Sequence, residues 1–384
     1  MINYPKVYLG KGRDKSVLRR HPWVFSGAIA SSERDLKEGE LVQVGGHGER
    51  FRGIGRGCSG SLAIKVLTFE EEVVDATWFE TRLAHAATKR ALLALPNSGT
   101  NCYRMVHGEG DMLPGLIVDV YDTVAVIQPH SVGMEMSLPH IVGGLQKLGI
   151  SNILHKPITR SQSTSVLSGE IPELVQVAEN EIKLFVDVLK GQKTGFFIDQ
   201  RDNRSLLRQY AKGKSVLNVF SYTGGFSLSA LAGGADSVVS VDSSSMALDL
   251  AAQNVQINEF SGEHKSLKMD ALPYLDNMDE AYDIIVLDPP AFAKHKSARH
   301  RALKAYQRIN EAGLRNVKPG GMLFTFSCSQ VVDNQLFFDT IRAAAINVGR
   351  SISVLHRMRQ PADHPVSIYH PEGEYLKGLV LSVD

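Results

Sequence analysis

The alternation of short apolar runs with helical segments after about residue 181 constrains the fold of this chain more than any other feature. Near-continuous apolar runs of strand length occupy residues 215–220, 237–241, 284–287 and 322–326, and helix-forming stretches separate them. Strands of this kind, alternating with helices, are typical of a parallel sheet that helices cover on both faces. Ligands bind beyond the carboxyl ends of the strands in such sheets. We therefore expect the chemical residues directly after these runs.

The N-terminal segment has a different pattern, in which glycines separate short β segments. These segments lie at residues 7–9, 23–25, 41–44, 51–55 and 62–67. Short strands punctuated by glycine are typical of small closed sheets. The sequence therefore predicts a small β-barrel at the N-terminus.

The middle of the chain predicts a compact α+β domain. Helical periodicity covers residues 75–95, residues 116–120 and 123–128 suit the two strands of a hairpin, and a second helix is expected over 135–148. At roughly 100–200 residues per domain, the 384 residues allow two or three domains. We place the domains of this multidomain α/β chain at residues 1–70, 71–180 and 181–384.

Composition and charge limit the classes of function. Apolar residues make up 43% and charged residues 22% of the chain, as in globular proteins. The formal net charge of +1 gives no general attraction to nucleic acid, so contact with RNA requires local basic patches. No apolar run approaches the ~20 residues of a membrane span, and the first residues lack the apolar core of a secretory signal, so we expect a cytoplasmic protein without a membrane partner. The cysteines, Cys58, Cys102 and Cys328, match no zinc spacing, so neither a metal site nor a disulfide scaffold is expected.

A glycine-containing loop, residues 221–227, follows the first apolar run and would let a ligand approach the backbone closely. The next run ends in Asp242, which could accept hydrogen bonds from a ribose diol, and Asp270 follows a further strand where an adenine amine needs an acceptor. The loop is not GxGxxG and holds no lysine, which favours S-adenosylmethionine (SAM) over NAD and ATP. The alternatives are a plain β–α turn for the loop and helix capping for each aspartate.

Two further strand ends carry candidate catalytic residues. Asp288-Pro289-Pro290 is expected to form a stiff turn with exposed carbonyls, which suits the binding of a flat nucleobase. Similar turns serve enzymes that methylate exocyclic amines without a cysteine, so Cys328, at the exit of the last run, is the discriminating residue. A thiolate that adds to C6 of a pyrimidine makes C5 nucleophilic toward a methyl donor. The alternative is that Cys328 is a small buried hydrophobic side chain.

Two basic segments are candidate RNA-binding surfaces. Residues 294–308 include no acidic residue and offer Tyr306 or histidine residues for stacking on a base. A solvated helix face is the alternative. The N-terminal segment interleaves basic residues with Trp23 and Phe25. The candidate RNA-binding residues are Lys11, Arg13, Arg19, Arg20, Lys294, Lys296, Arg299, Arg301 and Lys304.

The sequence resembles the bacterial large-subunit (23S) ribosomal RNA cytosine-C5 methyltransferases, which join a PUA domain, a central α+β domain and a class I, Rossmann-like SAM-binding domain. The motifs that carry the resemblance span nearly the whole chain and lie at residues 11–13, 20–27, 108–111, 113–116, 195–202, 220–226, 288–290, 326–329 and 362–365. The stretch 151–175 looks shorter than the strand and hairpin region usual in that family.

The resemblance implies roles for individual residues. Cys328 would be the nucleophile and Asp288 would lie beside the target base, while Asp242 and Asp270 would contact the ribose and adenine of SAM. The segment around Asp199, Gln200 and Arg201 would close over the cofactor. The remaining cofactor contacts are expected at Phe220, Ser221, Tyr222, Thr223, Gly224, Gly225, Ser243, Asp288 and Pro289.

Several alternatives stay open at this point. A related guanine-methylating family shares the Tyr-Thr-Gly-Gly loop, so uracil-C5 or guanine methylation competes with cytosine-C5 methylation. An RNA-binding ribosome-assembly factor without catalysis would need only the N-terminal domain and a basic segment, whereas a methyltransferase of small molecules would leave both unexplained. The target nucleotide, the base that removes the C5 proton, the choice between naked RNA and an assembly particle, and a homodimer are left undecided.

Overall fold

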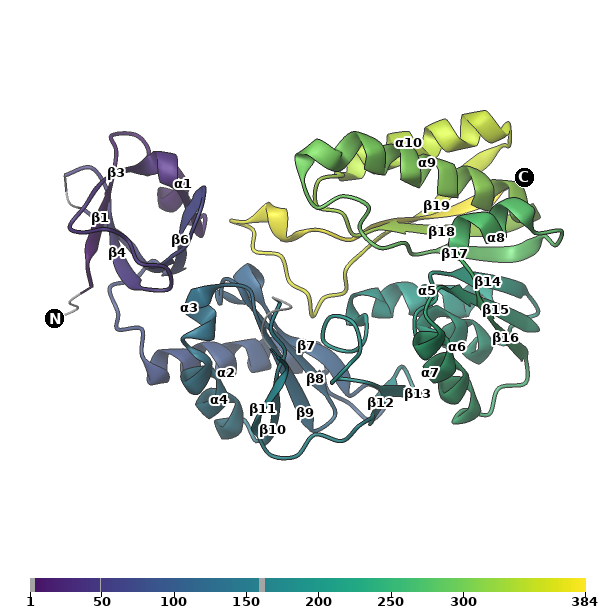
Figure 1. Ribbon diagram of the computed structural model, residues 1–384, viewed down its shortest axis with the longest axis horizontal. Coiled ribbons are helices and arrows are strands. Elements are labelled where there is room, and N and C mark those ends of the chain that lie inside the picture. Colours follow the sequence, from purple (N-terminus) through teal and green to yellow (C-terminus); the bar gives the residue numbers. More distant parts are fainter. Residues whose placement is uncertain (1–3, 49, 159–162) are drawn as a thin grey trace. The chain divides into compact units, whose positions relative to one another are not determined.

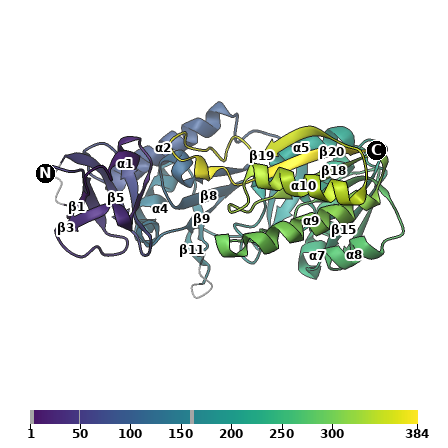
Figure 2. The same ribbon diagram turned by 90° about the horizontal axis from the view of Figure 1, so that it is seen from above.

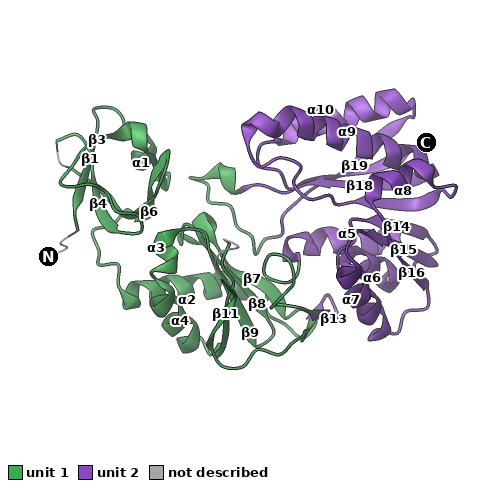
Figure 3. Ribbon diagram, in the orientation of Figure 1, with its two compact units in different colours: residues 1–177, 186–196, 362–373 green, residues 178–185, 197–361, 374–384 purple. Residues whose placement is uncertain are grey.

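The computed structural model describes residues 4–48, 50–158 and 163–384, and the chain divides into two compact units (Figure 3). Unit 1 consists of residues 1–177, 186–196 and 362–373, and unit 2 of residues 178–185, 197–361 and 374–384. Each unit is therefore assembled from segments that lie far apart in the sequence.

The N-terminal part of unit 1 is a six-stranded sheet that curls into a barrel (Figure 1). Its strand order is β2-β6-β5-β4-β1-β3. The five predicted β segments all form strands; β3 escaped prediction because it is largely exposed and lacks apolar alternation. The strands are β1 (Lys6–Leu9), β2 (Trp23–Phe25), β3 (Ile29–Ser32), β4 (Leu41–Gly45), β5 (Phe51–Gly57) and β6 (Leu62–Thr68), and the short helix α1 (Lys15–Leu18) lies between β1 and β2.

The rest of unit 1 centres on a five-stranded sheet of order β11-β10-β9-β8-β7. The predicted hairpin forms between β8 and β9, with Asp122 at its turn in a left-handed conformation, φ 54°. The elements are α2 (Ala76–Leu92), β7 (Cys102–His107), β8 (Leu116–Tyr121), β9 (Val124–Pro129), α3 (Val132–Glu135), α4 (Leu138–Lys147), β10 (Asn152–His155) and β11 (Ser165–Ser168).

The helix predicted over residues 135–148 forms as α4, but it begins three residues later, at Leu138, and the separate short helix α3 ends at Glu135. Pro139 lies in the first turn of α4. Proline has no N–H to donate to a carbonyl one turn earlier, so it favours the start of a new helix. Within the stretch 151–175, β10 and β11 form an antiparallel pair, and residues 159–162 lie outside the described residues.

Unit 2 is built on a seven-stranded sheet of order β16-β15-β14-β17-β18-β20-β19. The four strands predicted from the sequence, β14, β15, β17 and β18, are parallel, and β16 joins them in parallel. At the other edge β20, which was not predicted, runs antiparallel to both β18 and β19. The strands are β14 (Ser215–Val219), β15 (Ser237–Asp242), β16 (Glu263–Lys268), β17 (Tyr282–Leu287), β18 (Val317–Ser327), β19 (Ile352–Arg359) and β20 (Lys377–Val383). A separate two-stranded sheet comprises β12 (Val175–Glu179) and β13 (Ile182–Val186).

Helices cover both faces of this sheet, as predicted. Alternate residues of β17 enter different cores: Ile284 and Val286 pack with α5 and α6, whereas Ile285 and Leu287 pack with α9 and α10. Figures 1 and 2 both show α9 beside α10. No helix in the described ranges is long and apolar enough to cross a membrane. The helices are α5 (Arg201–Tyr210), α6 (Gly225–Ala232), α7 (Ser245–Gln256), α8 (Ala271–Asn277), α9 (Arg299–Asn316) and α10 (Asn334–Val348).

Candidate active site

The candidate residues of unit 2 leave one edge of the sheet. Val219 of β14 is in register with Val241 of β15 and with Leu287 of β17, and Leu287 is in register with Thr325 of β18. Because these strands are parallel, the residues that follow them emerge at the same, carboxyl edge. The loop after β14 and the side chains of Asp242, Asp288 and Cys328 therefore share this edge.

The loop after β14 has an unusual backbone. Phe220, Tyr222 and Gly224 all have positive φ values, 61°, 47° and 83° respectively. Such values strain residues that carry a Cβ, and strain of this kind gathers at functional sites. Backbone hydrogen bonds hold the loop in place, from Ser221 N to the Val241 carbonyl (3.1 Å) and from Gly224 N to the Ser221 carbonyl (2.9 Å). The left-handed Phe220 and Tyr222 go beyond the sequence prediction, which placed special backbone geometry only at the glycines.

Asp242 does not cap helix α7. Ser244 occupies that position, and its side chain accepts a hydrogen bond from Ala247 N. Asp242 instead accepts hydrogen bonds from Tyr222 N at Oδ2 and from Ser244 N at Oδ1, both at 2.9 Å. Each oxygen retains a second acceptor site, which a ribose diol could use. Ser243, next in the chain, is exposed.

Asp270 and the loop hydroxyls also carry unused hydrogen-bonding capacity. Asp270 stands at the N-cap position of α8, but its exposed carboxylate makes no capping hydrogen bond. The buried Asn218 Oδ1, Ser221 Oγ and Thr223 Oγ1 have no hydrogen-bond partner among the described residues. Buried polar atoms are normally paired, so a polar ligand at the loop would supply what these atoms lack. The residues around the loop thus fit a cofactor rich in hydroxyl and amine groups.

Asp288 is held by a hydrogen-bonded chain. Gln200 Nε2 donates to Asp288 Oδ1 at 3.0 Å, and Gln200 Oε1 accepts from Asn203 Nδ2 at 2.6 Å. This chain fixes which end of the Gln200 amide faces the carboxylate. Asp199 accepts a hydrogen bond from the Tyr375 hydroxyl at 2.7 Å, and Arg201 is buried at the start of α5. The segment 199–201 is therefore anchored next to Asp288, and Asn203 and Tyr375 are partners that the sequence did not reveal.

Cys328 is half-buried where β18 ends. Its side chain packs at the border of the hydrophobic core that contains Phe326 and Met358. The following turn is fixed, because Ser329 Oγ donates to the Ala293 carbonyl at 2.7 Å. The cysteine therefore has some of the packing expected of a hydrophobic side chain, but it is not sealed in the core.

Tyr306 corrects one expectation. The residue is fully buried in the core between α9 and the sheet, so its ring cannot stack on RNA. Burial raises the pKa of its hydroxyl to about 12. Tyr306 lies on the apolar face of α9, together with Ala302 and Ile309, and this helical spacing was the signal that should have placed it inside.

The nine candidate RNA-binding residues are exposed. Arg299, Arg301 and Lys304 lie on the solvent face of α9, which is also what a plain solvated helix would show. In the barrel, Arg20 forms an exposed ion pair with Glu70 at 3.5 Å. A pair of this kind contributes little to stability, so the guanidinium stays available to a phosphate.

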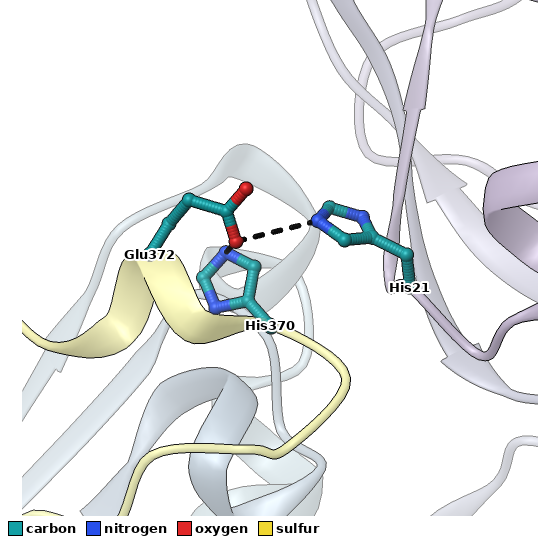
Figure 4. Close-up of side chains that lie close together, drawn as sticks. All are labelled: His21, His370 and Glu372. Atoms are coloured by element: carbon teal, nitrogen blue, oxygen red, sulfur yellow. Dashed lines mark ion pairs between the residues drawn. The ribbon is translucent and has the colours of Figure 1, made fainter.

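A histidine cluster in unit 1 was not anticipated (Figure 4). His21 Nε2 and His370 Nε2 lie 3.5 Å and 3.9 Å from Glu372 Oε2, a grouping that could in principle hold a metal ion. However, Trp23 N donates to His21 Nδ1 at 3.2 Å, so the proton of the neutral ring lies on Nε2, facing Glu372. A metal would need a lone pair at that nitrogen. The contact between His21 and Glu372 is therefore that of a neutral imidazole N–H with a carboxylate oxygen.

Comparison with known proteins shows which family the chain belongs to. The family described as S-adenosylmethionine-dependent methyltransferase matches residues 148–374, and a PUA-like domain matches residues 7–69. The ribosomal RNA large subunit methyltransferase I of Klebsiella pneumoniae subsp. pneumoniae is 39% identical over 99% of this chain and 98% of its own length. The chain belongs to this methyltransferase family. The enzyme of the same name from Escherichia coli (strain SMS-3-5 / SECEC) is also 39% identical, over 98% of this chain and 99% of its own length.

Solved structures agree on the fold. A SAM-dependent methyltransferase from Streptococcus mutans matches with a TM-score of 0.86 at 24% identity, covering 98% of this chain and all of that one. A methyltransferase solved in complex with SAH matches with a TM-score of 0.87, also at 24% identity and with the same coverage. The expected fold, a SAM-dependent methyltransferase domain with an N-terminal PUA-like domain, is thereby confirmed, as is SAM as the cofactor of the family.

Proposed function

We propose that this protein methylates C5 of a cytosine in large-subunit ribosomal RNA, with Cys328 as the covalent nucleophile. One observation carries the chemistry: Cys328 and Asp288 leave neighbouring parallel strands at the edge that also holds the strained loop after β14. The names of the relatives support ribosomal RNA as the substrate. The PUA-like barrel and the exposed basic residues offer surfaces for its phosphates.

The cofactor would be held by the residues whose polar atoms have spare capacity. Asp242 would accept hydrogen bonds from the ribose, and Asp270 would accept one from the adenine amine. The loop residues Phe220 to Gly225, with Ser243 and Pro289 near it, would surround the remaining atoms, and the segment 199–201 would close the site. When bound, SAM would supply an electrophilic methyl group from its sulfonium centre, whose sulfur–methyl bond breaks to leave S-adenosylhomocysteine.

The cysteine would activate the base. The Cys328 thiolate adds to C6 of the flipped-out cytosine, and the C5–C6 π electrons become available at C5, which is thereby made nucleophilic. After C5 has gained the methyl group, a base removes the C5 proton. The electrons of that C–H bond restore the C5–C6 double bond, and the C6–S bond breaks with its electron pair returning to Cys328.

Asp288 would favour cytosine over uracil. An ionised carboxylate is only an acceptor, and cytosine presents its N4 amine as a donor where uracil presents the O4 acceptor. Gln200 Nε2 occupies one side of Asp288 Oδ1 and keeps the carboxylate in a fixed orientation. The target base would then be chosen by its amine while Cys328 attacks C6.

Trapping with RNA that contains 5-fluorocytidine tests this proposal, because the fluorine at C5 cannot be removed as a proton. We expect a SAM-dependent covalent adduct that mass spectrometry locates at Cys328. The variant C328A should form no adduct, whereas C58A, which removes the half-buried thiol of the barrel, should form it normally. An adduct with 5-fluorouridine RNA instead would assign uracil, and full turnover by C328A would exclude the covalent route.

A further inference from the structure

A buried lysine lies at the start of β20. Lys377 is 5% exposed, and its ammonium group donates to two backbone carbonyls. Lysine is almost never buried without a partner, because its charge is costly to remove from water. Burial lowers the pKa of Lys377 to about 8, while the negative charges of Cys328, Asp333 and Glu374 act in the opposite direction. This cost suggests that the charge has a use.

Lys377 forms two hydrogen bonds with the turn that follows Cys328. Its Nζ donates to the Ser329 carbonyl at 2.7 Å and to the Val332 carbonyl at 2.6 Å. Across the antiparallel pairing of β18 and β20, Lys377 is in register with Ser327. The lysine thus contacts the residue after the cysteine and stands opposite the residue before it.

The positive charge of Lys377 and the negative charge of a Cys328 thiolate stabilise each other. Because a thiolate at Cys328 favours the ammonium form of Lys377, the ammonium favours the thiolate by the same free energy. The carbonyl oxygens accept two of the three ammonium protons without neutralising its charge. A buried positive charge, held by the carbonyls of the turn that follows the cysteine, therefore acts on the sulfur.

We propose that Lys377 is a positioning residue for Cys328, which fixes the turn 328–332 through its two carbonyls and stabilises the thiolate through its charge. This inference rests on the proposed function in so far as Cys328 is the nucleophile. It assigns to β20, which follows all the motifs around the cofactor, a part in preparing the cysteine for attack.

The pH profile of Cys328 alkylation by iodoacetamide in the full-length protein tests this role, with peptide mass spectrometry separating Cys328 from Cys58 and Cys102. In K377Q the midpoint of the Cys328 profile should rise by about one pH unit, which makes alkylation at pH 7 about tenfold slower. K377R, which keeps the charge, should restore most of the rate. The profile of Cys58 in the barrel serves as an internal reference and should not change.

Two outcomes overturn the inference. The first is an unchanged Cys328 profile in K377Q when SAM binding and the unfolding temperature stay near those of the unmodified protein. The second is an equal shift in K377R and K377Q, which would show that packing rather than charge is responsible. Should K377Q fail to fold, K377M keeps the apolar stem and permits the same measurement.

The alkylation assay needs neither RNA nor SAM, so it is independent of the trapping experiment. A shifted profile without a 5-fluorocytidine adduct would contradict the proposed reaction while the coupling of Lys377 to Cys328 stands. An adduct together with an unshifted profile would contradict only the role of Lys377.

Discussion

Two buried ion pairs of unit 1 and the polar groups at the carboxyl strand edge of unit 2 differ in how fully their hydrogen-bonding capacity is used. In unit 1, Arg90 and Asp111 form a bidentate pair with both N–O distances at 2.7 Å, and Arg104 and Asp119 form another. At the strand edge of unit 2, Asn218, Ser221 and Thr223 keep buried polar atoms without partners among the described residues, and Lys377 has only carbonyls. The two unit 1 pairs thus have their charges matched within the fold, whereas the polar groups named at the strand edge retain hydrogen-bonding capacity that the proposed cofactor site would use.

The largest effect should come from the strand edge and leave the fold intact. C328A is expected to lose turnover by on the order of a thousandfold or more, because the covalent route disappears entirely. SAM affinity, measured by calorimetry, and the free energy of unfolding should change little. A matching loss of stability would instead make Cys328 a packing residue and weaken the comparison.

Breaking a satisfied pair in unit 1 should do the reverse. R90M leaves Asp111, whose side chain is fully buried, with only the half-exposed Lys89 as a charged partner, and we expect a loss of about 3–5 kcal/mol in the free energy of unfolding. K89M removes a half-exposed partner of the same carboxylate and should cost less than about 1 kcal/mol. Denaturant titrations of both variants check this ordering, and equal losses would contradict it.

Two buried hydroxyl groups, those of Thr223 and Thr68, should show the same difference with smaller effects. T223V removes a buried hydroxyl that has no partner, so stability should hold while SAM affinity falls about tenfold. T68V removes a buried hydroxyl that donates to Glu72 at 2.5 Å, and should cost about 1 kcal/mol without affecting SAM binding. Calorimetry and thermal unfolding separate the two outcomes. Lower stability in T223V with unchanged affinity would place its hydroxyl among the structural groups.

The smallest effect is expected at the opposite, amino end of the same sheet. Burial raises the pKa of Asp283, but hydrogen bonds from Ser215 and Lys318 outweigh it and lower the pKa to about 2. The carboxylate therefore contributes stability that is fully present above pH ~4 and is lost as pH falls through about 2. D283N should be less stable than the unmodified protein by about 1 kcal/mol at pH 7, with the difference vanishing in acid. A constant difference across this range would exclude the linkage.

Much of the architecture followed from local patterns. The apolar runs of unit 2 predicted β14, β15, β17 and β18, and the rule for parallel strands brought Asp242, Asp288 and Cys328 to one edge. The same patterns missed β3, which lacks an apolar stripe, and placed the start of α4 three residues before Leu138. Local sequence patterns predict buried strands and their parallel order well, but they predict the ends of helices and exposed edge strands poorly.

The sequence by itself predicted that the loop after β14, two aspartates and Cys328 follow parallel strands, because runs of consecutive residues show which segments are buried strands and which are helices. Only the tertiary structure decided that Gln200 holds Asp288 and that Lys377 contacts the turn after Cys328 from an antiparallel strand. These contacts join residues 48 to 88 positions apart in the sequence, as for Ser329 with Lys377 and Gln200 with Asp288. Strand pairing and helix packing bring such residues together, and no local pattern encodes which partners will meet.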